Sequence, residues 1–239
     1  MDKQTFWKII DDTNSSLGQT SRRKFLNGIS EKLMNYTAKE INDWKNILDY
    51  YHGLAYRQGL WAACAAMGTH YTDDGFAYFR GWLISKGHDV FMKAIHDPDS
   101  LAEVDITDNE TEFEEFWYVA NHVYEKKKLY ECLDSKQIKN LYENWMKDEG
   151  KKIAAEYNKI CSTDCELDEF LEEHFICTES LRRKLDDDFE YKLPNENVIK
   201  DILEEIHLGK DIDSSWTCAD LEKIVPGLFA KYNVSMRMQ

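Results

Sequence analysis

The chain of 239 residues is acidic, with 45 Asp and Glu against 30 Lys and Arg and a formal net charge of -15 at pH 7. Only 3 prolines and 11 glycines accompany 43% hydrophobic residues, which excludes collagen-like, low-complexity and wholly disordered classes. No apolar run approaches the roughly 20 residues that span a bilayer, and no signal-like segment follows the polar start. We therefore expect a soluble, cytoplasmic protein with no membrane partner.

The acidic excess lies beyond residue 100, because residues 1–100 carry 12 basic and 12 acidic residues. Nucleic-acid affinity depends on Lys and Arg that displace counterions from phosphates, so we expect no direct nucleic-acid binding. The acidity serves either solubility alone or attraction to a basic partner protein. Solubility is the simpler interpretation, a basic protein is the expected partner, and the oligomeric state stays open.

Apolar residues recur every three or four positions along most of the chain, which predicts an all-α protein, an irregular multi-helix bundle. Short helices are expected around Phe6–Ile10 and Phe25–Leu33. The clearest helix lies between Thr37 and Tyr56, where Thr37 and Glu40 fit a capping box.

The small residues of Leu60–Met67 predict a central, buried helix that another helix can approach closely. Thr72 is expected to cap the next helix, which Gly87 ends in a left-handed conformation. A further helix covers His88–His96, and Asp97–Asp99 turns the chain.

The segment Thr111–Lys159 predicts two helices in antiparallel contact that bury both apolar stripes. The most charged stretch, Cys161–Glu190, is expected to be exposed. Asn195 is expected to cap a helix that Gly209 ends, and a short helical pair follows in Thr217–Tyr232. The stripes of the two antiparallel helices are Phe113, Phe116, Trp117, Ala120, Val123 and Tyr124 in one, and Ile138, Leu141, Tyr142 and Trp145 in the other.

The densest cluster of chemically capable side chains comprises His70, Asp73 and Asp74, with Arg80 downstream. The two aspartates fall in the first turn of a predicted helix, where carboxylates interact favourably with the free amides, and this is the favoured interpretation. Alternatively, one of them joins His70 in a cation or acid-base site. Arg80 lies too far from Asp74 for a contact along the helix, so it either pairs with a carboxylate of another helix, which we favour, or lines a pocket for an anionic group.

Aromatic residues surround this cluster in the sequence. Trp61 precedes it, and Phe76, Phe79 and Trp82 lie on the predicted helix that follows. We expect these four rings to form an aromatic groove that orders the core.

The six cysteines are most simply reduced thiols, and Cys64 is expected to be buried in its apolar run. Cys161, Cys165, His174 and Cys177 form a C-x3-C-x8-H-x2-C pattern, whose ligand types suit a tetrahedral structural zinc. The spacing does not match a standard zinc finger. A Cys161–Cys165 disulfide and ordinary thiols are the alternatives, and the thiols are favoured, so no cofactor is expected.

One series along the chain comprises Asp73–Phe76, Phe79–Arg80, Trp82–Ile84, Gly87 and Asp97–Leu101. This series resembles the signature of an uncharacterised bacterial family, domain of unknown function 4240 (DUF4240). The segments Phe6–Trp7, Leu60–Ala62 and Ile224–Tyr232 are also similar to that family. The resemblance covers roughly residues 1–130, implies a fold unit and a bacterial cytoplasmic setting, and supplies no reaction.

We therefore predict a helical DUF4240-like domain in residues 1–135 and an acidic helical extension in 136–239, packed on or beside it. No familiar catalytic signature is present in the sequence. The leading hypothesis is a non-enzymatic interaction or regulatory module, immunity-like or an adaptor, with an acidic docking surface. The alternative is an enzyme, or a small-ligand or metal-binding protein, whose pocket is built from His70, Asp73, Asp74 and Arg80.

Overall fold

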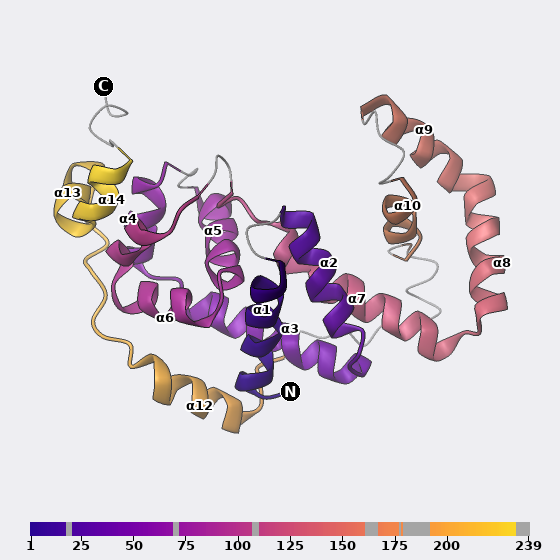
Figure 1. Cartoon of the computed structure of the whole chain (residues 1–239), viewed down its shortest axis with the longest axis horizontal. Coiled ribbons are helices and arrows are strands. Elements are labelled where there is room, and N and C mark those ends of the chain that lie inside the picture. Colours follow the sequence, from indigo (N-terminus) through magenta and orange to yellow (C-terminus); the bar gives the residue numbers. More distant parts are fainter. Residues whose placement is uncertain are drawn as a thin grey trace. The chain divides into compact units, whose positions relative to one another are not determined.

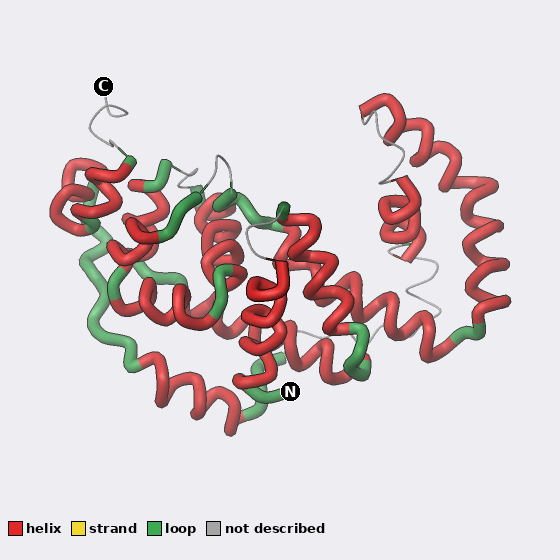
Figure 2. Tube along the Cα trace, in the orientation of Figure 1, coloured by secondary structure: helices red, strands yellow, loops and turns green. Residues whose placement is uncertain are grey.

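The computed structural model describes residues 1–17, 21–68, 72–106, 110–160, 167–176, 178 and 192–232. Within these ranges the regular structure consists of thirteen α-helices and three short 3-10 or π turns, with no strand (Figures 1 and 2). The all-α prediction is therefore confirmed. None of the described helices is long and apolar enough to cross a membrane.

The chain divides into two compact units. The first comprises the described residues within Met1–Lys32, Asp43–Val119 and Tyr191–Gln239, and the second those within Leu33–Asn42 and Ala120–Glu190. The predicted division at residue 135 differs from this grouping, because the C-terminal helices belong with the N-terminal ones. The helices are α1 (Lys3–Leu17), α2 (Arg22–Leu33), α3 (Ala38–Leu54), α4 (Gln58–Ala66), α5 (Asp73–Ser85), α6 (His88–His96), α7 (Glu115–Cys132), α8 (Ser135–Trp145), α9 (Lys151–Ile160), α10 (Leu167–Ile176), α12 (Glu196–Ile206), α13 (Leu221–Ile224) and α14 (Pro226–Lys231).

Several predicted helix boundaries are confirmed by hydrogen bonds. The Thr37 amide donates to the Glu40 carboxylate over 2.9 Å, and the Glu40 amide donates back to the Thr37 hydroxyl over 3.3 Å. The Thr72 hydroxyl accepts from the Gly75 amide over 3.1 Å at the start of α5. Gly87 has a φ of 96° between α5 and α6, as its predicted left-handed role requires.

Packed aromatic rings form the core of the first unit. Phe6 and Trp7 of α1 contact Tyr51 of α3, with ring centroids 5.4 and 4.8 Å apart. Trp7 and Tyr51 also contact Phe91 of α6. These side chains are at most 4% exposed, so α1, α3 and α6 share one apolar interior.

Carboxylates that cap helix starts connect the segment after α12 with the rest of the first unit. The Asp211 carboxylate accepts from the amides of Gln58 and Gly59 at the start of α4, over 2.6 and 3.1 Å. In the same way, Asp99 accepts from the amides of Gly227 and Leu228 at the start of α14, over 2.9 Å each. Asp99 lies in η1 (Pro98–Glu103), a 3-10 helix at the predicted turn.

The helix α12 begins as predicted and ends earlier than predicted. Asn195 caps it by accepting from the Asn197 amide over 3.0 Å. It ends at Ile206, and His207 adopts the left-handed conformation expected of a terminating glycine. Gly209 therefore lies beyond the helix, and the prediction that it ends α12 was wrong.

In the second unit, the α8 stripe is only partly buried. Leu129 of α7 forms a buried cluster with Phe175 and Ile176 of α10, and the α8 stripe packs against this cluster without full burial. The expectation that both stripes bury was therefore wrong for α8. The expectation of an exposed Cys161–Glu190 was wrong for Leu171, Phe175 and Ile176, while most of that stretch lies outside the described residues.

Candidate functional site

The two predicted aspartates lie at the start of α5. Asp73 and Asp74 occupy its first turn and are exposed. Carboxylates there interact favourably with the free amides of the helix start, as the capping interpretation expects. His70 lies outside the described residues, and so does its predicted contact with Asp73 or Asp74.

Arg80 is 7% exposed and faces α3. Its Nη1 atom donates to the carbonyl oxygen of His52 over 2.8 Å and lies 3.2 Å from Nδ1 of the same residue. Its Nε atom donates to the Phe76 carbonyl, and its guanidinium lies 4.9 Å from the ring centroids of Phe76 and Tyr56. Burial lowers the pKa of Arg80 to about 10. In the described part of the chain, carbonyl, imidazole and ring contacts thus take the place of the predicted carboxylate.

The predicted aromatic residues form a connected row. The rings of Trp61 and Phe76 stack with centroids 4.6 Å apart, and the row continues through Phe79 to Trp82. Phe76, Phe79 and Trp82 are at most 1% exposed, whereas Trp61 is half-buried. The row is thus mainly interior packing, and only Trp61 offers surface for a contact.

A buried polar cluster on α3 was not predicted from the sequence. Lys45 and Asp49 form an ion pair of 2.5 Å, with side chains only 7% and 9% exposed. Burial raises the pKa of Asp49 and lowers that of Lys45, although each charge partly opposes the effect on its partner. The Lys45 ammonium lies 5.6 Å from the ring centroid of Trp117. We call Lys45, Asp49, His52 and Arg80 the buried cluster.

His52 in this cluster is held as a neutral imidazole. Its Nε2 atom lies 2.9 Å from the Ala77 carbonyl, which can only accept, so Nε2 carries the proton and Nδ1 accepts from Arg80. Burial, and then the charge of Arg80, lowers the pKa of His52 to about 3. The buried cluster therefore joins α3 to α5 through satisfied polar contacts.

The predicted zinc ligands are mostly outside the described residues. Cys161, Cys165 and Cys177 fall there, while His174 lies on α10, exposed, with its Nδ1 atom 2.8 Å from the Phe170 carbonyl. Among the residues that are described, no group of three potential metal ligands occurs. Cys64 is buried in α4, as predicted.

An open pocket of about 440 Å³ lies among α1, α6 and α12 of the first unit. A second pocket of about 310 Å³ adjoins it, since both are lined by Lys3, Gln4 and Glu205. We call the two together the acidic groove. Its charged lining comprises five carboxylates, Asp11, Asp12, Asp201, Glu204 and Glu205, against Lys3 and Lys8, with His88 beside them.

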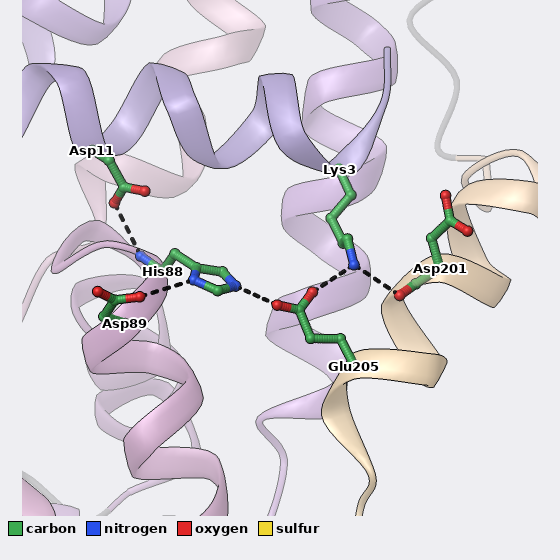
Figure 3. A network of polar contacts seen from close by, with 6 residues as sticks. All are labelled: Lys3, Asp11, His88, Asp89, Asp201 and Glu205. Carbon is green, nitrogen blue, oxygen red and sulfur yellow. Dashed lines mark hydrogen bonds and ion pairs between the residues drawn. The ribbon is translucent and has the colours of Figure 1, made fainter.

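Figure 3 shows the polar contacts in the wall of the groove. The His88 ring lies between two carboxylates, with Nε2 2.7 Å from Glu205 and Nδ1 3.1 Å from Asp89. Lys3 donates to the other oxygen of Glu205 over 2.5 Å and to the Asp201 carbonyl over 2.9 Å. The backbone amide of His88 donates to Asp11 over 3.0 Å. We call Lys3, His88 and Glu205 the clasp, because they join α12 to α1 and α6.

The clasp keeps Glu205 ionised. Burial acts to raise the pKa of Glu205, but hydrogen bonds from Lys3 and His88 lower it by more, and the net shift is downward. The side chains of Glu205 and His88 remain 30% and 29% exposed, so solvent reaches them. The arrangement can hold cations and exchange protons with water. Sequence reasoning missed it because 117 positions separate His88 from Glu205.

Comparison with known proteins gives one result. A family model described as a protein of unknown function, DUF4240, matches residues 1–126, just over half of the chain. No curated protein and no solved structure matches the chain significantly. The matched region includes α1 and α6 of the acidic groove, whereas α12 lies beyond it.

Proposed function

The chain belongs to the DUF4240 family, and from that premise we propose that it is a non-enzymatic protein-interaction or regulatory module that docks a basic protein partner. An adaptor or an immunity-like protein fits this description. The docking surface is the acidic groove of α1, α6 and α12.

The observation that carries this proposal is the way the groove already holds an ammonium group. Lys3 reaches from α1 to the Glu205 carboxylate and the Asp201 carbonyl of α12. A lysine or arginine of a partner can make contacts of the same kind with the other carboxylates of the lining. Asp201 and Glu204 are exposed on α12, and Asp12 is exposed on α1.

The charge of the groove also suits a basic partner. Five carboxylates against two lysines give it an excess of negative charge. The net charge of the whole chain, which includes these residues, is -15. Such a field attracts a basic protein from a distance and sets its orientation on arrival. Because the groove charges are solvent-exposed, binding is expected to weaken as salt rises.

Fluorescence anisotropy of a labelled peptide rich in lysine and arginine, added to the full chain, tests this proposal. Binding is expected at about 50 mM salt and is expected to be largely lost at about 300 mM. An acidic peptide of equal length should not bind. The variant Asp12→Asn/Glu204→Gln is expected to weaken binding about fivefold, because it removes two groove carboxylates.

A matched variant separates the groove from general surface charge. Glu131→Gln/Glu143→Gln removes two exposed carboxylates from α7 and α8 and gives the same change of net charge. It should leave peptide affinity nearly unchanged. Equal weakening by both double variants would refute docking in the groove, and binding of the acidic peptide would refute the basic partner.

A further inference from the structure

The clasp places carboxylates around the imidazole of His88. Both ring nitrogens of His88 lie within hydrogen-bond distance of a carboxylate oxygen, on Glu205 and on Asp89. A neutral imidazole has only one N–H, so its other nitrogen would turn a lone pair toward a carboxylate. The imidazolium form has two N–H groups and can donate to both carboxylates.

The two carboxylates respond differently to movement of α12. Asp89 follows His88 directly in the chain, so their contact is local and does not depend on α12. Glu205 is on α12, and its contact with His88 exists only while α12 is docked. Docked α12 therefore offers the imidazolium one acceptor that it lacks when α12 is released.

The helix α12 is also attached to the first unit by its apolar face and by Lys3. Its apolar face buries Val198, Ile202 and Ile206, and Lys3 adds the polar contacts with Glu205 and Asp201. Non-helical segments of mostly exposed residues flank it, 192–195 before and 207–210 after. A helix bounded in this way can be released while the rest of the first unit remains folded.

We propose that the clasp is a proton-controlled latch, in which protonation of His88 fastens α12 onto α1 and α6. Docking strengthens as the pH falls through the titration range of histidine and weakens as the pH rises through it. The charged groups of every element around the ring set this direction, since carboxylates outnumber cations. They are Lys3, Lys8, Asp11 and Asp12 of α1, Asp89 of α6, and Asp201, Glu204 and Glu205 of α12.

Release of the latch changes what the surface presents. It exposes the apolar face of α12 and separates Glu205, Asp201 and Glu204 from the carboxylates of α1. The acidic groove then loses one wall. This inference does not depend on the proposed function, because it concerns the attachment of α12 whether or not a partner binds.

Hydrogen exchange of the full chain, followed by mass spectrometry, measures the latch directly. Protection factors of the α12 amides, corrected for intrinsic exchange, should fall about threefold between pH 6 and pH 8 relative to those of α5. In His88→Gln, which keeps a hydrogen-bonding side chain and has no proton to titrate, the α12 protection should not change with pH. Glu205→Gln should also abolish the pH dependence.

His96→Gln is the matched control, because His96 is an exposed histidine at the other end of the same helix. It should retain the threefold change. Pulse labelling of α5 reports whether each variant is folded, and the wild-type pH series needs no variant. Equal α12 protection of the wild type at pH 6 and pH 8, or loss of the pH dependence in His96→Gln, would overturn the proposal.

Discussion

Two polar networks of the first unit use the same side-chain types in opposite surroundings. The buried cluster contains Lys45, Asp49 and His52, and the clasp contains Lys3, Glu205 and His88. The cluster lies in the core, where its lysine and aspartate are less than a tenth exposed, and the clasp carboxylate is 30% exposed. Because Lys3 of the clasp is itself only 14% exposed, the comparison reports mainly what burial does to a carboxylate and an imidazole.

The two histidines differ in their access to solvent and in the groups that surround them. Desolvation and the neighbouring Arg80 lower the pKa of His52 to about 3, so His52 stays neutral and acts as an interior hydrogen-bonding group. His88 has a carboxylate at each ring nitrogen and is 29% exposed, which are the surroundings on which the proposed latch depends. As the pH falls, the proposed latch of α12 should strengthen, whereas the stabilisation that neutral His52 gives to the fold should decline.

The largest expected effect comes from breaking the buried ion pair. Asp49→Asn leaves the Lys45 ammonium buried without its carboxylate and should lower the free energy of unfolding by about 3 kcal/mol. Urea unfolding followed by circular dichroism measures the change. Replacement of both partners, Lys45→Met/Asp49→Leu, should restore most of the stability, because no uncompensated charge then remains.

The pair formed by Lys8 and Asp12 is a matched control, with the same residue types and the same spacing on an exposed face of α1. Asp12→Asn should leave the unfolding midpoint within experimental error. If Asp49→Asn is no more destabilising than Asp12→Asn, burial does not distinguish the two networks.

Acidification should test the state of His52. Its pKa in the folded chain, about 3, lies below the ordinary value of 6.5, so protons bind more readily to the unfolded chain. The stabilisation from its neutral form is complete above pH 6.5 and declines as the pH falls toward 3. Between pH 7 and pH 5 the loss should be about 2 kcal/mol.

The variant His52→Gln isolates this contribution, because the other titrating groups are common to both proteins. Urea unfolding at pH 7 and pH 5 should show a smaller loss for the variant than for the wild type. An equal loss in the two proteins would mean that His52 does not titrate differently in the folded and unfolded chain.

A smaller effect is expected where Arg80 is replaced by another cation. Arg80→Lys keeps the charge but loses the planar fork that reaches the His52 carbonyl and the Phe76 carbonyl together. The free energy of unfolding should fall by about 1 kcal/mol. Arg57 is more exposed, donates to the Gly209 carbonyl over 2.9 Å and lies 4.0 Å from the Asp211 carboxylate, so Arg57→Lys should cost less.

Much of the fold could be predicted because its signals are local. The capping pair Thr37 and Glu40 lies three positions apart, and Gly87 marks a backbone conformation that other residues avoid. The end of α12 was missed because His207 takes the left-handed conformation in place of Gly209. The extension was expected on or beside the first domain, but its particular contacts could not be predicted, since that of Asp211 with Gln58 spans 153 positions.

The sites were less predictable for the same reason. The exposed position of Asp73 and Asp74 follows from their place at a helix start, which the sequence displays. The burial of Lys45 and Asp49 does not follow from the sequence, because Lys8 and Asp12 have the same spacing on α1 and are exposed. The clasp joins residues from three helices, and no spacing in the sequence indicates that Lys3, His88 and Glu205 meet.

The smallest effect is expected at the clasp lysine. Lys3→Met keeps most of the apolar stem but removes the ammonium from Glu205 and from the Asp201 carbonyl, and should lower the free energy of unfolding by about 0.5 kcal/mol. The same change at Lys8, whose contact is exposed, should have no measurable effect. Because Lys3 and His88 share one carboxylate, removal of the ammonium leaves Glu205 to His88 alone. The α12 protection in Lys3→Met should therefore depend more steeply on pH than in the wild type, and a shallower dependence would show that the two cations do not act on the same carboxylate.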